Sequence, residues 1–83
     1  MEYFFKPSAV RDLKKLSLGV RRIIFKKLSF YFKSDNPLKF AEVLKDKTLG
    51  EFRFRVGDYR VIFDVASNKA IILKIGHRKN VYK

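Results

Sequence analysis

The sequence predicts an α+β fold in which two N-terminal helices pack on a small, mostly antiparallel sheet. Between residues 8 and 33 the apolar residues recur every three to four positions, as on one face of a helix. From Gly50 onward they alternate with other residues, as in strands that are buried on one side. A short aromatic run precedes the helices. We therefore expect the order β-α-α-β-β-β within one domain spanning residues 1–83.

The first strand is expected at Glu2–Lys6 and ends at Pro7, because proline lacks the N–H that a sheet interior needs. Ser8 is then in position to cap a first helix, which Leu18-Gly19 interrupts. The apolar positions of this helix are Val10, Leu13 and Leu16.

A second helix carries apolar residues on one face and cations on the other, and it ends at Ser34-Asp35-Asn36-Pro37. Its apolar residues are Val20, Ile23, Ile24, Leu28 and Tyr31. Its cations, ordinarily a solvated face, are Arg21, Arg22, Lys26, Lys27 and Lys33. Leu38–Leu44 then forms a short third helix or an irregular crossing, and a polar loop follows at residues 45–48.

A two-residue turn at Gly57-Asp58 predicts a hairpin in which Arg55 lies opposite Arg60. Alternation then places one apolar set toward the helices: Phe52, Phe54, Val56, Tyr59, Val61, Phe63 and Val65. The opposite face receives Glu51, Arg53, Arg55, Arg60, Ile62 and Asp64. Two opposed arginines destabilise a strand pair, so we expect that folding alone does not select them and that a bound polyanion does.

A second turn at Ser67-Asn68-Lys69 leads into the last predicted strand, Ala70–Ile75. Its core residues are expected to be Ile71, Leu73 and Ile75. This alternation puts Lys74 on the face that carries the arginines, and Arg78 joins it if the strand continues. More cations thus converge on that face.

Net charge narrows the classes of partner. Twenty Lys and Arg against eight Asp and Glu give a formal net charge of +12. This excess exceeds what solubility requires, and an anionic partner relieves the resulting self-repulsion. Nucleic acid is the commonest such partner, and a ribosome, an acidic protein or an anionic membrane satisfies the same requirement.

Composition also excludes several kinds of site. The chain has no cysteine, which removes thiol chemistry and zinc–thiolate sites. No apolar run approaches the roughly 20 residues of a membrane span, and no signal-peptide core follows Met1, so we expect a cytoplasmic protein. A single histidine among scattered carboxylates disfavours a catalytic metal, and no Gly-rich phosphate loop is present. We expect neither a metal nor a cofactor.

Two segments, LGEFRFRVGDYRVIF at residues 49–63 and IGHRKNVYK at residues 75–83, resemble the C-terminal half of the RelE/ParE superfamily of toxin–antitoxin toxins. The resemblance covers essentially the whole chain, although residues 1–45 match only in pattern. It implies a RelE-like fold and a cognate antitoxin as partner. RelE-type members are ribosome-dependent endoribonucleases that cut mRNA in the decoding site. The ParE branch instead poisons DNA gyrase, and fold alone does not separate the two.

Matching to the RelE pattern assigns five site residues by resemblance: Arg53, Arg55, Arg60, Arg78 and Tyr82. Arg53 and Arg55 stand where the best-known RelE has lysines. An arginine practically cannot accept a proton, so this departure leaves the base unassigned. Lys74 and Lys79 are expected to bind RNA. A member that binds its antitoxin but has lost toxicity is a further alternative.

Metal-free cleavage of RNA needs a base for the 2′-OH, cations for the phosphorane and an acid for the leaving 5′-oxygen. The resemblance assigns Arg60 and Arg78 to the scissile phosphate. Arg53 and Arg55 then hold backbone phosphates or share the charge stabilisation. Tyr82 stacks on a base or transfers a proton, and stacking is preferred. Two residues are acid–base candidates: Glu51, more often a counter-ion, and His77, more often structural. Asp58 is expected to be a turn residue.

Overall fold

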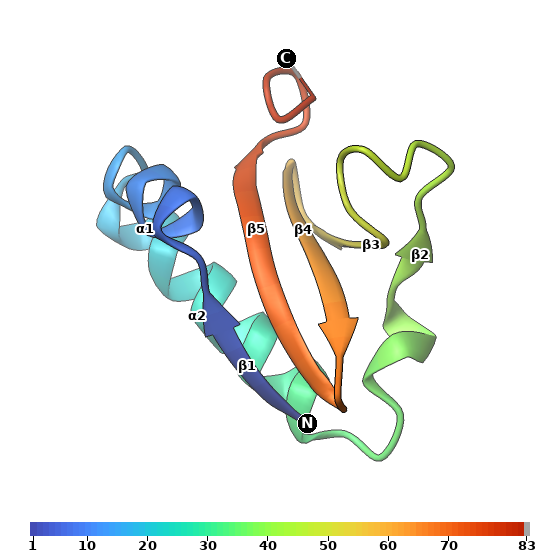
Figure 1. The fold of residues 1–83 in the computed structure, drawn as a ribbon. Coiled ribbons are helices and arrows are strands. Elements are labelled where there is room, and N and C mark those ends of the chain that lie inside the picture. The colour runs from blue at the N-terminus through green and yellow to red at the C-terminus, as the bar shows by residue number, and fades with distance from the viewer. Residues whose placement is uncertain (83) are drawn as a thin grey trace.

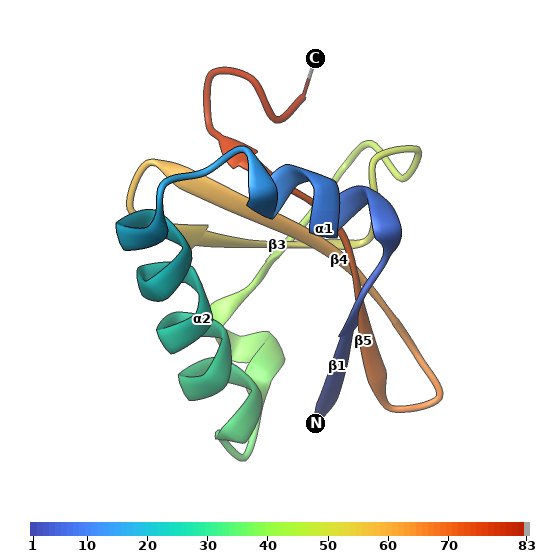
Figure 2. The same ribbon diagram turned by 90° about the vertical axis from the view of Figure 1, so that its left-hand side faces the viewer.

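The computed structural model describes residues 1–82, and its centre is one five-stranded sheet in the order β1-β5-β4-β3-β2. The strands are β1 (Glu2–Phe5), β2 (Glu42–Val43), β3 (Phe52–Val56), β4 (Tyr59–Ala66) and β5 (Lys69–His77). Among the strand pairs of residues 1–82, only β1–β5 is parallel. Helices α1 (Pro7–Lys14) and α2 (Leu18–Lys33) lie on one side of this sheet (Figures 1 and 2). The predicted α+β class is therefore confirmed.

The chain between α2 and β3 contains one strand more than predicted. Where a third helix or an irregular crossing was expected, a short 3₁₀ helix, η1 (Pro37–Phe40), is followed by β2. In β2, Glu42 pairs with Arg53 and Val43 pairs with Phe52. The order becomes β-α-α-β-β-β-β, because these two residues complete the sheet edge beside β3.

Ser8 does not cap α1, contrary to the prediction. The residue before α1 is Lys6, which makes no side-chain cap, and Pro7 occupies the first turn. The Ser8 hydroxyl instead donates to the carbonyl of Leu73 at 2.7 Å. Asp12 Oδ2 accepts from the backbone N–H of Ile75, two residues beyond Leu73 on β5, at 2.9 Å. Side chains of α1 thus hydrogen-bond the backbone groups at the edge of β5 beyond the point where β1 stops pairing with it.

The break between the helices also differs from the prediction, because Leu18 and Gly19 belong to α2. The interruption falls at residues 15–17, and the hydroxyl of Ser17 caps α2 by accepting from the N–H of Val20 at 3.2 Å. Within α2, Ile23 faces solvent with 58% of its surface exposed, so its predicted place in the core is wrong. The buried residues of α2 are Ile24, Leu28 and Phe32.

The main core lies between the helices and the sheet. Its β3–β4 register matches the prediction at every pair from Phe52↔Phe63 to Val56↔Tyr59. Aromatic rings fill its centre: the Phe54 ring lies 4.6 Å from that of Phe63 and 5.3 Å from that of Phe32, centroid to centroid. Burial of such large rings gives a chain this short its stability.

Because β5 contains a bulge, the residues of the last strand that are buried differ in part from the prediction. Ile62 pairs with Lys74 and Phe63 pairs with Ile72, which leaves Leu73 as an extra residue between them. Alternation is therefore reset in the middle of the strand. Ile75 and Lys74 keep their predicted faces, whereas Ile72 and Ala70, not Ile71 and Leu73, are the buried residues toward the helices.

A second, smaller cluster lies on the sheet face opposite the helices, which we term the outer face. It consists of Leu44, Ile62 and Val81, with Leu49 and Leu73 packed against them. Ile62 was expected among the polar residues of this face but is fully buried. Gly50 permits this packing, because a Cβ at that position would lie 2.6 Å from Ile62 Cγ2 and its φ is +149°. The loop before β3 and the C-terminal turn thereby fold over the sheet.

Candidate functional site

Strand pairing arranges the side chains of the outer face in two rows. The first row crosses from β2 to β5 and contains Glu42, Arg53, Ile62 and Lys74. The second crosses from β3 to β5 and contains Arg55, Arg60 and Gly76. Arg55 does lie opposite Arg60, as the sequence predicted. The rows bring most of the predicted cations together on one surface.

Glu42 joins the arginines of β3. Its Oε2 lies 2.9 Å from Arg53 Nη2, and its Oε1 lies 2.6 Å from Arg55 Nε. The pKa of Glu42 is lowered, chiefly by the hydrogen bond from Arg53 and further by the nearby positive charges of Arg53, Arg55 and Arg60. The carboxylate therefore offsets part of the repulsion between the opposed arginines.

Sequence reasoning missed Glu42 because it treated Leu38–Leu44 as a helix or an irregular crossing. The available signal was the apolar–polar–apolar run of Ala41, Glu42 and Val43, which fits a short strand with the carboxylate pointing away from the helices. Only a strand beside β3 places Glu42 within reach of Arg53 and Arg55.

Tyr82 holds Arg53 from its other side. Arg53 Nη1 donates to the Tyr82 hydroxyl at 2.5 Å, and the guanidinium carbon lies 5.9 Å from the centroid of the tyrosine ring. The pKa of Arg53 is raised, first by this hydrogen bond and also by Glu42. The Arg53 side chain is only 20% exposed, against 60% for Arg55. Arg53 Nε is buried without a partner among residues 1–82. Arg53 is thus a fixed cation, whereas Arg55 is accessible.

Arg60 and Arg78 flank the β3–β4 turn. Arg60 Nη1 donates to the carbonyls of Gly57 and Tyr59, both at 2.9 Å. The N–H of Arg78 donates to the Asp58 carbonyl at 2.8 Å, and Arg78 Nε lies 3.6 Å from Asp58 Oδ1. The Arg78 side chain is 56% exposed. Asp58 is the turn residue that was predicted, and it also orients Arg78.

The other predicted residues lie away from these contacts. Glu51 sits at the opposite end of the hairpin, where its Oε1 accepts from the N–H of Val65 at 3.0 Å and its own N–H donates to Asp64 Oδ1 at 2.9 Å. These bonds join β3 to β4, as expected of a structural carboxylate. Lys79 is exposed in the C-terminal turn.

His77 points to the helix side of the sheet, as its strand parity predicted. It pairs with Tyr59, and the two rings meet edge to face at 5.5 Å. Its Nδ1 accepts from the N–H of Lys79 at 3.2 Å. The carbonyl of His77 accepts from Asn80 and Val81, which fixes the C-terminal turn. The imidazole is therefore separated from the arginines by the sheet itself.

Chemically, the outer face is suited to binding phosphate groups. It combines two accessible guanidinium groups, Arg55 and Arg78, with a carboxylate, Glu42, and the half-exposed ring of Tyr82. Within residues 1–82, no group of three His, Asp or Glu side chains is arranged to hold a metal ion. Over the same residues, neither helix is long and apolar enough to cross a membrane.

Comparison with known proteins identifies the family. Residues 3–82 match the model of the ParE toxin of type II toxin–antitoxin systems, parDE. The chain belongs to the RelE/ParE toxin superfamily. It is 32% identical over 83 residues to Toxin RelG of Mycobacterium tuberculosis, covering 95% of this chain and 92% of that protein. It is thus similar to toxins of type II toxin–antitoxin systems along nearly its whole length, and the predicted family is confirmed.

Two solved RelE-type structures share the fold of this toxin. The toxin–antitoxin complex RelBE2 of M. tuberculosis superposes with a TM-score of 0.77 at 28% identity, covering 93% of this chain and 96% of that one. The RelB–RelE complex of Methanococcus jannaschii gives a TM-score of 0.69 at 27% identity, covering 95% and 94%. The family model thus carries the ParE description, whereas the relative and both structures carry RelE-type names.

Proposed function

We propose that this toxin is a ribosome-dependent endoribonuclease that cleaves mRNA in the decoding site and is neutralised by a cognate antitoxin. The observation that carries the proposal is the convergence of five side chains on the outer face. They are Arg53, Arg55, Arg60, Arg78 and Tyr82, which stand at the positions of the RelE pattern, with arginines in place of lysines at 53 and 55. A protein that needed these strands only for folding would gain nothing from opposed arginines.

Charge stabilisation is the part of the reaction that this face supplies best. When the 2′-oxygen attacks phosphorus and the bond to the 5′-oxygen breaks, negative charge develops on the non-bridging phosphate oxygens. Arg60 and Arg78 both contact the β3–β4 turn, at Gly57 and Asp58, so we assign them to the scissile phosphate. Arg55 and Arg53 bind the neighbouring backbone or share this charge.

Glu42 is assigned to positioning the arginines of β3. It is the carboxylate in direct contact with two of the arginines, and its lowered pKa keeps it ionised at neutral pH. Both of its oxygens bind arginines and its pKa is lowered, so Glu42 is a weak proton acceptor. Glu51 is also engaged, because its Oε1 accepts from the N–H of Val65 at the far end of the hairpin. We therefore assign no general base among these carboxylates. Glu42 orients Arg53 and Arg55, so its loss is expected to affect both binding and chemistry.

Tyr82 is assigned to base stacking. Its hydroxyl is held by Arg53, and 40% of its surface is exposed. A tyrosine fixed by its hydroxyl presents its ring in one orientation, which suits stacking on an unpaired base. Lys74, beside Ile62, and Lys79, in the C-terminal turn, add positive charge for the RNA backbone.

An acidic antitoxin segment is the expected inhibitor. Both similar structures are complexes of a toxin with its antitoxin. On a chain of net charge +12, acidic residues laid across the outer face would remove the site for phosphate. We expect the affinity to fall as salt rises, because exposed ion pairs are screened. An affinity that is equal in low and high salt would contradict this electrostatic account.

A gyrase inhibitor of the ParE type is the second candidate, and the ParE family match is the observation in its favour. One experiment separates the two. Purified toxin is added to a translation reaction, and the mRNA is mapped by primer extension. We expect new 5′ ends within ribosome-bound codons, and the Arg60→Ala variant should lack them. Intact mRNA together with inhibited gyrase supercoiling would favour the alternative.

A further inference from the structure

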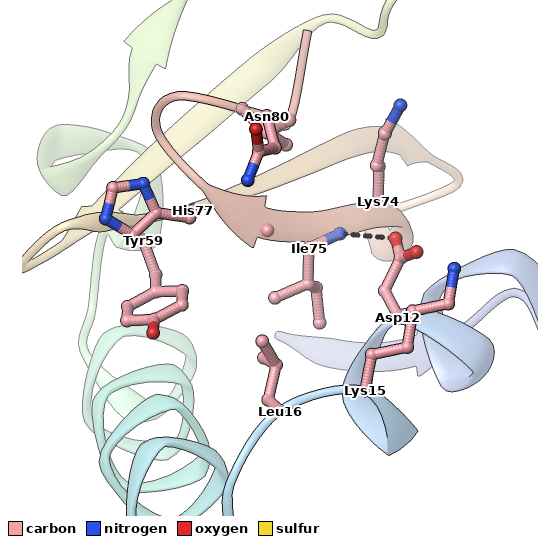
Figure 3. A pocket seen from close by; sticks show the side chains of 10 residues that line it. Asp12, Lys15, Leu16, Tyr59, Lys74, Ile75, His77 and Asn80 are labelled. Atoms are coloured by element: carbon pink, nitrogen blue, oxygen red, sulfur yellow. Dashed lines mark hydrogen bonds between the residues drawn. The ribbon is translucent and has the colours of Figure 1, made fainter. Parts of the chain in front are cut away.

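A cavity of about 380 Å³ lies at the free edge of β5 (Figure 3). It exists because β1 stops pairing with β5 at Phe5↔Ile72. Beyond that point α1 covers the strand edge, and the C-terminal turn folds back over its end. The cavity is the space that remains between α1, β5 and the turn.

The walls of this cavity are apolar and aromatic on some sides and polar on the others. Leu16 and Ile75 provide an apolar surface at its centre, and the rings of Tyr59 and His77 stand together on one side (Figure 3). The two rings meet edge to face at 5.5 Å, which holds the imidazole in place. Apolar and aromatic surfaces of this kind accept the faces of flat heterocycles.

Polar groups line the other sides. Asn80 directs its amide toward the cavity from the C-terminal turn, and Asp12 lies across from the rings (Figure 3). Asp12 Oδ2 accepts from the N–H of Ile75 at 2.9 Å, which fixes the carboxylate, and a carboxylate can accept further bonds on its second oxygen. The cations at the rim are Lys15 and Lys74.

The cavity and the arginines lie at the same end of β5. Gly76, which lines the cavity, is the β5 partner of Arg60, and His77 directly precedes Arg78. An RNA chain bound at Arg60 and Arg78 would reach the cavity by passing around the end of β5, because the rings of Tyr59 and His77 lie on the helix side of the sheet. The cavity offers cations at its rim for a phosphate and aromatic rings for a base.

We infer that this cavity binds the nucleotide adjacent to the scissile phosphate and contributes to the choice of cleavage site. The inference rests on the proposed nuclease function. The Asn80 amide donates to a ring nitrogen or carbonyl of the base, and Asp12 accepts from its exocyclic amino group. Adenine, guanine and cytosine carry such an amino group and uracil does not. The cavity should therefore discriminate against uridine.

A binding experiment on the ribosome-free toxin tests this directly. AMP, GMP, CMP and UMP, and ribose 5-phosphate as a probe without a base, are titrated at fixed ionic strength while backbone amides are followed by NMR. We expect saturable shifts at Gly76, His77 and Asn80. The preferred amino-bearing nucleotides should bind about 5-fold or more tightly than UMP and ribose 5-phosphate, the range of one good hydrogen bond. Equal shifts with all five probes would overturn the inference, because phosphate alone would then account for binding.

Variants locate the binding site. Asn80→Ala should weaken binding of the preferred nucleotide about 3- to 10-fold, as expected for the loss of one hydrogen bond. Lys15→Ala should weaken it about 2- to 5-fold through the loss of a surface charge. The matched control is Lys14→Ala, which removes the same charge one position away on α1, outside the cavity lining. If Lys14→Ala and Lys15→Ala have the same effect, the cavity is not the site.

The cleavage assay keeps this test separate from that of the proposed function. If nucleotides bind as described but mRNA stays intact, the cavity is supported and the nuclease proposal fails. If mRNA is cut, Asn80→Ala should redistribute the cleavage sites toward codons with uridine beside the cut, at a similar total rate. An unchanged distribution, together with no nucleotide binding in the NMR titration, would overturn the cavity and leave the nuclease proposal standing.

Discussion

The face of the sheet under the helices and the outer face use the same strands, yet their side chains are stabilised differently. Under the helices, Phe54 and Phe63 are fully buried among other rings. On the outer face, the buried cluster around Ile62 and Val81 is small, and charged groups surround it. The hydrophobic effect alone explains the residues on the face under the helices. The outer face combines folding contacts with charges that folding does not require, which is where function is expected.

The largest expected effect is on the helix-covered face. Phe54→Ala should lower the free energy of unfolding by about 3–5 kcal/mol, because it leaves a ring-sized cavity in a well-packed core. Urea unfolding followed by circular dichroism measures this. Val43→Ala is the control, since Val43 is 67% exposed on the edge strand, and it should change stability by about 0.5 kcal/mol or less. A similar loss in both variants would contradict the distinction between the two faces.

Arg60→Ala and Arg78→Ala should show the reverse behaviour, with activity lost and stability kept. Each removes a cation from the scissile phosphate, so cleavage should slow about 100-fold, corresponding to about 3 kcal/mol of transition-state stabilisation. The free energy of unfolding should change by about 0.5 kcal/mol or less. Arg11→Ala, on the surface of α1, is the control for loss of one arginine. Unchanged toxicity of both site variants would refute the assignment.

Ile62→Ala should lower both the stability of the fold and the cleavage activity. Deleting this fully buried side chain should cost about 2–3 kcal/mol, near the lower end for isoleucine, because the small cluster can partly collapse. Val81 packs in the same cluster one residue before Tyr82, so the ring that we assign to stacking should also lose its orientation. Unfolding and cleavage measured on one preparation should both decline. A stable variant with full activity would show that the cluster does not support the site.

Glu42→Gln should reveal a pH dependence. The folded-state pKa of Glu42 lies below the ordinary value of 4.5, so its stabilising effect is complete above that pH and is lost as pH falls through the lowered pKa. Because the side chain is 42% exposed, we expect a contribution of about 0.5–1 kcal/mol at pH 7. Unfolding curves of wild type and Glu42→Gln should differ at pH 7 and converge toward pH 3. A difference that persists at pH 3 would exclude an electrostatic origin.

The smallest expected effect concerns the opposed arginines. Sequence alone predicts that Arg55→Thr strengthens the fold by relieving repulsion from Arg60. The structure adds the 2.6 Å contact of Arg55 with Glu42, which offsets that gain, so we expect a change of about 0.3 kcal/mol or less. In a Glu42→Gln background only the repulsion remains, and Arg55→Thr should then stabilise by about 0.5–1 kcal/mol. Identical effects in both backgrounds would show that Glu42 does not compensate the pair.

Much of this fold was predictable where one local signal decided the outcome. The Gly57-Asp58 turn set the β3–β4 register, and alternation from that turn placed Arg53, Arg55 and Arg60 on one face. Predictions failed where local rules compete. Ser8 and Ser17 both suit a helix cap, yet only Ser17 acts as one, because Pro7 begins α1 and the Ser8 hydroxyl is within reach of the β5 edge.

By itself, the sequence determined the α+β class, the hairpin register and the gathering of cations, because turn chemistry and side-chain alternation act between residues close along the chain. Only the tertiary structure decided the rest. It brought Glu42 beside Arg53 and Arg55, set Tyr82 on Arg53, 29 positions away, and buried Ile62 on the outer face. It also reset the alternation of β5 at Leu73. These contacts depend on which strand occupies a sheet edge and where the chain folds back, and no local periodicity encodes either.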